Sequence, residues 1–207
     1  MDPNLLLTPY RQQKRNSMVQ VILDTARTIM REQGVAALSM QELARRINLR
    51  APSLYHYFAG KMEIYDALFR LGFTLYGEHM QKLYQGASTW QDYLQRSFEG
   101  YLTFAKQNPE LYQLCFERPV PGFTPSPASL KISQDLLHQF YRQAAEWKAA
   151  IHSDLSPEQI IDLSLAMMHG ITAMHMANEP DLSPGQGRFG SLIPAATELF
   201  EKAWSQQ

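Results

Sequence analysis

Helical spacing of apolar residues is the feature that most limits how this chain can fold. Apolar residues recur at the i, i+3, i+4 spacing of a helix along the sequence, and no stretch of useful length alternates as a β strand does. The pattern begins with Ile22, Ala26 and Ile29, and Gly34 follows where the helix should end. We therefore predict an all-α fold of about nine helices.

Capping residues and helix breakers predict where these helices begin and end. Capping boxes at 39–42, 88–91 and 156–159 mark three helix N-termini. The stretches 118–127 and 179–190 are rich in proline and glycine and are predicted loops. Beyond residue 60 the predicted helices run over about 61–84, 88–106, 128–151, 157–178 and 191–205, with a short helix near 109–116.

The formal net charge of the 207-residue chain is −1, but this charge is unevenly distributed. Residues 1–60 carry eight basic and four acidic residues, a net charge of +4, whereas the other residues carry 11 and 16, a net charge of −5. A basic segment beside an acidic body indicates two parts with different partners, of which the first faces a polyanion. Such an excess also arises by chance, so the interpretation depends on a motif.

Cysteine content and hydropathy indicate a soluble cytoplasmic protein. The single cysteine, Cys115, excludes an internal disulfide and a cysteine-based zinc site, and it fits a reducing compartment. The apolar run Leu5–Leu7 is too short for a signal peptide. Nowhere do 18 apolar residues run together, so we predict no membrane-spanning helix and no membrane partner.

The sequence lacks the residue patterns of catalysis and of metal binding. It contains no glycine-rich phosphate loop, no carboxylate pair on one helix face and no Ser-His-Asp set. His169 and His175 are six residues apart and fall on different faces of a helix, so we predict no metal site and no cofactor. A small helical enzyme is therefore the weakest hypothesis.

Two short helices joined by about four residues are predicted after the first helix. Ser39 caps one of them, which contains the small residue Ala44, and Pro52 lies in the first turn of the other. Asn48 lies between them, where we expect a left-handed conformation, because asparagine tolerates it. This arrangement is the helix-turn-helix pattern, in which the second helix enters the major groove of DNA.

The residues from Ser39 to Leu49 and from Arg50 to Phe58, followed by Lys61, resemble the head of the TetR family of bacterial transcriptional regulators. The match covers about residues 16–65. It departs from the family pattern at Asn48, where glycine is usual, and at Arg50, where serine is common. The intact segment from Arg50 to Lys61 argues against a third hypothesis, a helical adaptor with a vestigial head that binds only proteins.

The resemblance implies two domains and a function. Residues 1–62 would form a tri-helical DNA-binding domain with a basic arm, and residues 63–207 a helical domain for ligand binding and dimerisation. The expected function is that of a ligand-responsive, sequence-specific regulator of transcription. We expect a repressor that leaves a palindromic operator when a small, largely apolar or aromatic effector binds.

The resemblance also implies which residues contact DNA. Ser39 would present a hydroxyl and backbone amides to a phosphate, and Gln41 would reach either bases or backbone. Arg45 and Arg46 are interpreted as a solvated face. The basic residues near the N-terminus are interpreted as an irregular arm, either contacting DNA or only solubilising the chain. The full predicted set is Arg11, Lys14, Arg15, Ser39, Gln41, Arg50, Ala51, Pro52, Ser53, Tyr55, His56, Tyr57 and Lys61.

The last two long helices, at about 157–178 and 191–205, would form the homodimer interface that the resemblance implies; an internal core is the alternative. His169 would lie near a pocket with Gly170 allowing close approach, or the pair would serve only the close packing of helices. Core packing is likewise the alternative for each methionine of this region. The predicted ligand-binding residues are Phe98, Tyr101, Leu102, Phe104, Tyr112, Cys115, Phe116, Met167, Met168, His169, Met174 and His175.

Overall fold

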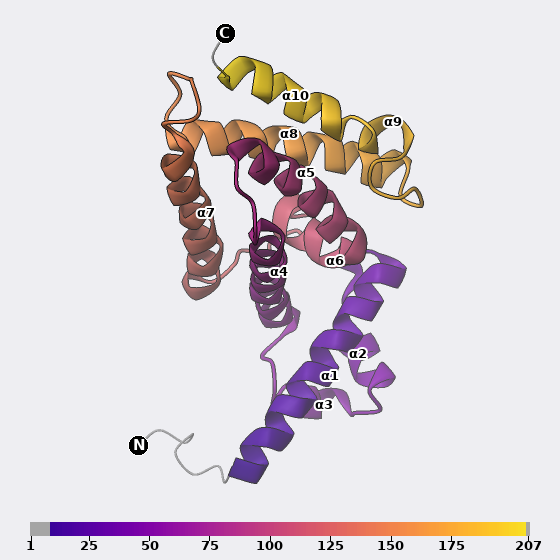
Figure 1. Cartoon of the computed structure of the whole chain (residues 1–207). Coiled ribbons are helices and arrows are strands. Elements are labelled where there is room, and N and C mark those ends of the chain that lie inside the picture. The colour runs from indigo at the N-terminus through magenta and orange to yellow at the C-terminus, as the bar shows by residue number, and fades with distance from the viewer. Residues whose placement is uncertain (1–8, 206–207) are drawn as a thin grey trace. The chain divides into compact units, whose positions relative to one another are not determined.

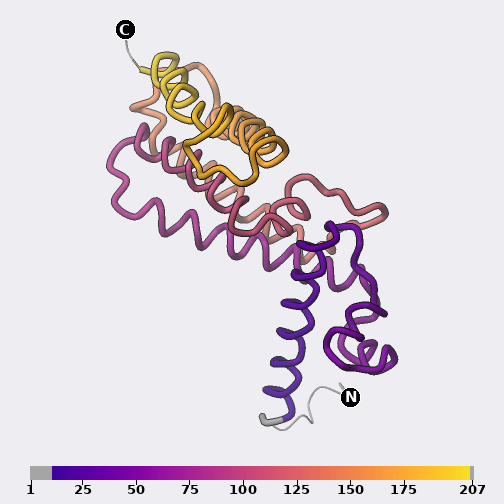
Figure 2. Tube along the Cα trace, turned by 90° about the vertical axis from the view of Figure 1, so that its right-hand side faces the viewer, coloured from indigo at the N-terminus to yellow at the C-terminus, as the bar shows by residue number. Residues whose placement is uncertain are grey.

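A computed structural model describes residues 9–205 of the chain; the run Leu5–Leu7 and the rest of residues 1–8 lie outside it. The described residues form helices and loops without a strand, which confirms the all-α prediction. Figure 1 labels the α helices and Figure 2 traces the chain. The helices are α1 (Pro9–Gln33), η2 (Val35–Ala37), α2 (Met40–Arg46), α3 (Ala51–Leu54), α4 (Lys61–Tyr84), α5 (Trp90–Gln107), α6 (Pro109–Tyr112), η3 (Gln113–Glu117), α7 (Pro127–Trp147), α8 (Pro157–Asn178), α9 (Gly187–Gly190) and α10 (Ile193–Trp204).

The prediction of an irregular basic arm is wrong for Arg11, Lys14 and Arg15, because α1 begins at Pro9 and includes all three. Arginine, lysine and glutamine are good helix formers, so this polar segment continues the helix that the apolar pattern starts. One turn is further fixed by a hydrogen bond of 3.0 Å from Gln12 Nε2 to Asn16 Oδ1.

The capping box of α8 is confirmed. Ser156 Oγ accepts a hydrogen bond from the backbone N–H of Gln159 at 3.3 Å, and Gln159 Oε1 accepts one from the N–H of Ser156 at 2.9 Å. The box predicted at 88–91 is wrong, because Thr89 rather than Ser88 is the N-cap residue of α5, and its side chain makes a single cap by accepting a hydrogen bond from the N–H of Asp92.

Two compact units make up the chain. The first comprises Met1–Leu71 and Glu110–Ser129, and the second comprises Gly72–Pro109 and Leu130–Gln207. These units follow from the contacts that residues make, whereas the boundary predicted between residues 62 and 63 separates functions. That functional boundary stays a prediction.

A small apolar core holds α1, α2 and α3 together within the first unit. Ile22, Ala26 and Ile29 form the inner face of α1, and they are fully buried together with Leu43 of α2 and Leu54 of α3. The spacing of these residues places them on one face of each helix, so burial follows directly from the sequence pattern. The short helices α2 and α3 depend on this core, because helices of this length are marginal by themselves.

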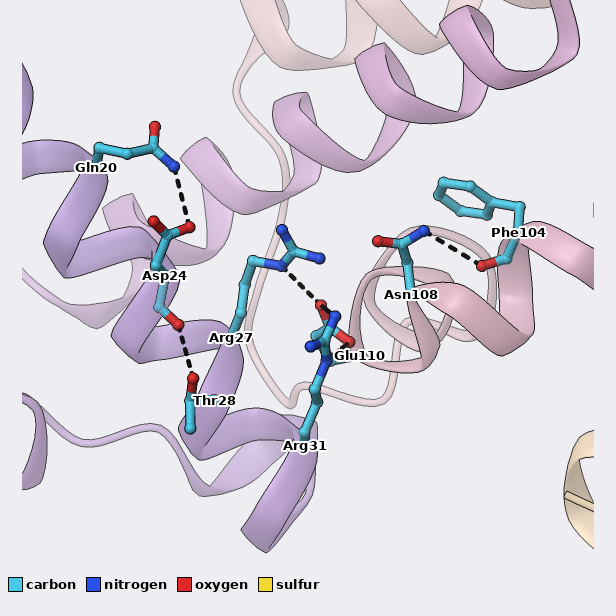
Figure 3. Close-up of polar contacts among 8 residues, drawn as sticks. All are labelled: Gln20, Asp24, Arg27, Thr28, Arg31, Phe104, Asn108 and Glu110. Carbon is cyan, nitrogen blue, oxygen red and sulfur yellow. Dashed lines mark hydrogen bonds and ion pairs between the residues drawn. The ribbon is translucent and has the colours of Figure 1, made fainter. Parts of the chain in front are cut away.

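A buried carboxylate joins α1 to α6 within the same unit (Figure 3). The side chain of Glu110 is 0% exposed, and it accepts hydrogen bonds from Arg27 Nε at 2.7 Å and from Arg31 Nε at 2.6 Å. Arg31 makes a second contact of 3.0 Å to Oε1, so the carboxylate receives donors at both oxygens. Charge-assisted hydrogen bonds of this kind compensate for removing the carboxylate from water.

Tight packing of α5 organises the second unit. Gly100 allows the approach of α4, because a Cβ at this position would lie 2.4 Å from Leu83 Cδ1 and 3.0 Å from Met80 Sδ. Both α8 and α10 pack against α5, and both views show them on the same side of it. By length and composition alone, α8 is the one described helix that is long and apolar enough to cross a membrane. Within the chain, 28% of its most apolar 18-residue stretch is buried.

We expect Glu110→Ala to lower the free energy of unfolding by about 3 kcal/mol, because it leaves two arginines without their buried acid. Urea unfolding followed by circular dichroism measures this change. Glu117→Ala, which removes an exposed carboxylate seven residues away, should change stability by no more than about 0.5 kcal/mol. Equal midpoints for the two variants would show that the ion pairs contribute nothing.

Candidate nucleic-acid interface

The turn between α2 and α3 is a Schellman motif built on Asn48. Asn48 has a φ of 54°, which confirms the predicted left-handed conformation. The N–H of Leu49 donates to Ala44 O at 2.9 Å, and the N–H of Asn48 donates to Arg45 O at 3.3 Å. These bonds satisfy the last carbonyls of α2 and set the direction in which the chain enters α3.

The start of α2 is capped by only half of the predicted box. Ser39 Oγ accepts a hydrogen bond from the N–H of Glu42 at 3.1 Å, and the Ser39 hydroxyl proton remains available as a donor. The carboxylate of Glu42 does not return to Ser39; instead it accepts bonds of 2.8 Å from both Arg45 and Arg46. The cap therefore differs from the prediction because the acid has stronger partners one turn further along.

The short helix α3 is anchored by two buried side chains. Leu54 is fully buried and Phe58 nearly so, and the turns after α3 keep both on the inner side. The opposite side is left open to solvent, where Arg50 and Pro52 are exposed and the Tyr55 side chain is 54% exposed. Arg50 occupies the N-cap position of α3 without capping the helix through its side chain.

All predicted DNA-binding residues belong to the first unit. Most of them are exposed, whereas Ala51, Ser53 and Tyr57 are half-buried. Their contact with DNA stays a prediction. The exposed members are Arg11, Lys14, Arg15, Ser39, Gln41, Arg50, Pro52, Tyr55, His56 and Lys61.

A contact that sequence reasoning missed brings Arg15 to the end of α3. Its guanidinium donates to the backbone oxygen of His56 at 3.3 Å and lies 5.7 Å from the centre of the Tyr57 ring. The two segments are 41 residues apart in sequence, so no local spacing reveals this pairing. Three predicted DNA-binding residues are thus adjacent, although one of them comes from α1.

Charge on α2 is neutralised, whereas charge beside α3 is not. Hydrogen bonds from Arg45 and then from Arg46 lower the pKa of Glu42 to about 2, so this carboxylate is ionised at neutral pH. Arg46 also pairs with Glu32 at 2.7 Å. Among residues 9–205, by contrast, Arg50 and Lys61 have no acidic partner. Positive charge without an acidic residue in the same turn therefore lies at the start of α3, and Lys61 adds an unpaired cation to the first turn of α4, which also holds Glu63.

The second unit contains an aromatic cavity of about 40 Å³. Its wall includes the tryptophans Trp90, Trp147 and Trp204 and the tyrosines Tyr76, Tyr84 and Tyr93, together with apolar residues and two serines. Of the predicted ligand-binding residues, Met168 lines this cavity. A largely apolar wall with few polar groups is typical of small-molecule sites.

The other predicted ligand-binding residues lie elsewhere. Phe98, Tyr101, Leu102 and Phe104 are buried in α5, and the Tyr101 hydroxyl lies 3.1 Å from His169 Nδ1. Three more, Tyr112, Cys115 and Phe116, belong to the first unit. Ligand binding by these residues stays a prediction.

Within α8 the remaining predicted ligand residues have different environments. Met167 is half-buried, Met174 is exposed, and His175 is fully buried with its Nε2 3.1 Å from Leu182 O. His175 therefore contacts the following loop. A Cβ on Gly170 would meet no atom within 4 Å, so this glycine does not serve a close helix contact inside the subunit.

Burial restricts the chemistry of the single cysteine. It raises the pKa of the Cys115 thiol well above its ordinary value, and Cys115 Sγ lies 3.7 Å from Phe69 O. In the part of the chain that the structure describes, no group of three His, Cys, Asp or Glu side chains is placed to hold a metal ion.

Known proteins match this chain both in its N-terminal region and in its overall fold. Residues 22–68 match the family model described as bacterial regulatory proteins, tetR family. A curated relative from Haemophilus influenzae, described as an uncharacterized HTH-type transcriptional regulator, is 27% identical over 171 residues, which cover 82% of this chain and 86% of the relative.

Solved structures share the fold along nearly the whole chain. A protein of unknown function from Rhodococcus sp. RHA1 has a TM-score of 0.75 at 20% identity, with 91% of this chain and 95% of that chain covered. A TetR family transcriptional regulator from Thermus thermophilus has a TM-score of 0.63 at 18% identity, with 90% and 96% covered.

We expect Tyr55→Ala to weaken binding to an operator by about tenfold or more, because a lost hydrogen bond to a charged phosphate costs about 1.5 kcal/mol or more. Fluorescence anisotropy with labelled duplex measures the affinity. Val21→Ala, which trims another exposed apolar side chain of the first unit, serves as the control and should bind as the wild type does. Unchanged affinity of Tyr55→Ala would remove Tyr55 from the contacts.

Proposed function

Because the chain belongs to the TetR family of bacterial transcriptional regulators, we propose that it is a ligand-responsive, sequence-specific repressor. It is a regulator and not an enzyme. We place its action in the cytoplasm, where its DNA operator lies. Residues 1–62 would bind DNA, and residues 63–207 would bind the effector and form the dimer.

The observation that carries this proposal is the exposed side of α3. The Schellman turn at Asn48 fixes α3 against α2, while Leu54 holds it to the core. Arg50, Pro52 and Tyr55 remain exposed beside it. A short helix that is anchored on one side and exposes polar and cationic groups on the other can enter a major groove with its N-terminus first.

Exposed apolar residues on α8 and α10 support a homodimer. Leu163 of α8 is 48% exposed and Leu199 of α10 is 61% exposed, and Met174 and Leu192 add to this apolar surface. Gly170 is also exposed in the middle of α8, where a glycine costs about 1 kcal/mol relative to alanine. Cover by the same helices of a second copy would account for both features.

A homodimer gives the proposed operator its symmetry. Two copies of α3 related by a two-fold axis would read a palindrome with half-sites about one helical turn of DNA apart, roughly 34–36 Å. An effector that binds better to a conformation with another spacing would shift the population toward it and so release the operator. The second unit, which holds the aromatic cavity, is the proposed site of the effector.

A mobility-shift assay on the DNA upstream of this protein's own gene tests the proposal. We expect binding that survives competition by random duplex and whose affinity falls steeply with salt, because phosphate contacts release counterions. Binding no tighter than to random duplex would contradict the proposed function.

In the same assay, the Arg50→Ala variant shows whether Arg50 contacts a phosphate or a base. If Arg50 meets a phosphate, the slope of log affinity against log salt should decrease by about 0.9, with affinity lost evenly across sequences. If Arg50 contacts a base, the slope should stay unchanged, and the preference for one base over the others at a single operator position should weaken. An Arg50→Ala variant that binds the operator like the wild type, with the same slope and specificity, would exclude both.

We expect Leu163→Glu to weaken the dimer by at least about tenfold, because it places a charge on the apolar face proposed as the interface. Sedimentation velocity over a concentration series measures the dimer. Leu182→Glu is the matched control, since Leu182 is exposed to 40% but lies in the loop after α8. A Leu163→Glu variant that dimerises as well as this control would contradict the proposed interface.

A further inference from the structure

We infer that the effector of this regulator is a neutral, largely aromatic molecule that carries one hydrogen-bond acceptor, such as a ketone or ether oxygen. It would occupy the aromatic cavity of the second unit, with its acceptor on the indole N–H of Trp147. This inference rests on the proposed response to a ligand and adds the chemical class of that ligand and the residue that selects it.

The wall of the cavity excludes charge. Aromatic and aliphatic side chains from α4, α5, α7, α8 and α10 form most of it, and it contains no Asp, Glu, Lys, Arg or His. A carboxylate or an ammonium group bound there would lose its hydration without gaining an opposite charge, and this is strongly unfavourable. The ligand that fits this wall is therefore neutral.

Four of the five hydroxyl groups of the wall, those of Ser97, Tyr84, Tyr93 and Ser164, have partners that the structure identifies, and the fifth, on Tyr76, is not among the buried polar atoms that lack a partner. Ser97 Oγ donates to Tyr93 O at 2.7 Å, so the Tyr84 hydroxyl donates to Ser97 Oγ across 2.9 Å. Tyr93 also hydrogen-bonds to the Tyr84 hydroxyl. Burial raises the pKa of Tyr84 to about 12, so the Tyr84 phenol remains protonated and remains a donor. Ser164 Oγ donates to Ile160 O at 2.8 Å. These four hydroxyl protons are used within the protein.

Trp147 is the exception in this wall. Its Nε1 is buried and has no hydrogen-bond partner among the described residues. An indole nitrogen can only donate, so the group that satisfies it must be an acceptor. Because buried polar groups are nearly always paired, a bound molecule that supplies one acceptor at this position completes the wall.

The volume of the cavity limits the size of the ligand. About 40 Å³ exceeds the space that one water needs, whereas an engineered cavity of about 150 Å³ is known to take benzene. A single ring would therefore enter only when wall side chains move, and Met168, which is unbranched and flexible, is suited to that. Filling the cavity thus favours a conformation in which these wall side chains have moved, as an effector requires.

The chain offers a direct spectroscopic readout of this site. Its three tryptophans are Trp90, Trp147 and Trp204, and all three line the cavity. A proton–nitrogen correlation spectrum of the full chain should therefore show three indole resonances, each from the cavity wall. The Trp147→Phe variant assigns one of them by its loss.

The probes are acetophenone, ethylbenzene and benzoate, which share a ring but differ in acceptor and charge. We expect acetophenone to bind most tightly and to move the Trp147 indole proton downfield. Ethylbenzene should bind more weakly, without a downfield shift, and benzoate should bind the least. Calorimetry gives the affinities, and this readout on the wild type holds even if a variant fails to fold.

Two matched variants test the role of the indole N–H. Trp147→Phe keeps an aromatic ring but removes the donor, so the preference for acetophenone over ethylbenzene should fall about three- to tenfold. Trp204→Phe removes a tryptophan of the same wall and should leave that preference as it is. Loss of the preference in both variants, or in neither, would overturn the assignment to Trp147.

The remaining outcomes separate this inference from the proposed function. Tighter binding of benzoate, equal indole shifts with acetophenone and ethylbenzene, or no binding of acetophenone would overturn the inference while leaving operator binding intact. Failure of the proposed function is instead detected without any probe, as absent operator binding in the mobility-shift assay.

Discussion

The buried carboxylate of Glu110 is the interaction on which the first unit depends. A charge that is fully withdrawn from water is tolerable only if donors meet it, and Arg27 and Arg31 supply them from one face of α1. Since these arginines are about one helical turn apart, the pair fixes the rotation of α1 about its axis as well as its distance from α6. The same helix carries Ile22, Ala26 and Ile29, so this rotation also determines which face supports α2 and α3.

Local rules predicted most of the fold because most of it is locally determined. The helical spacing, the cap at Ser156 and the left-handed turn at Asn48 each depend on residues within a few positions of one another. The start of α1 was missed because its first turns are polar and show no apolar face, although their residues are good helix formers. The capping box at Ser39 is only half formed for a different reason. The Glu42 carboxylate accepts hydrogen bonds from Arg45 and Arg46 instead of from the backbone of Ser39.

The sites were less predictable, because their defining contacts join distant segments. Arg15 reaches His56, and Arg27 reaches Glu110, across 41 and 83 residues respectively, and no spacing in the sequence indicates either pair. The predicted ligand residues of the second unit were selected for the chemistry of their side chains, and they all come from only two helices. The cavity is instead lined from five helices, and the tryptophan that lacks a partner comes from the end of α7.

The chain's one thiol has a consequence for the signals this regulator can sense. Cys115 is buried, and its pKa is raised, so the reactive thiolate is scarce at physiological pH. Peroxides and disulfides react with thiolates that they can reach, and this sulfur is neither ionised nor accessible in the folded protein. Oxidative stress is therefore a poor input for this molecule.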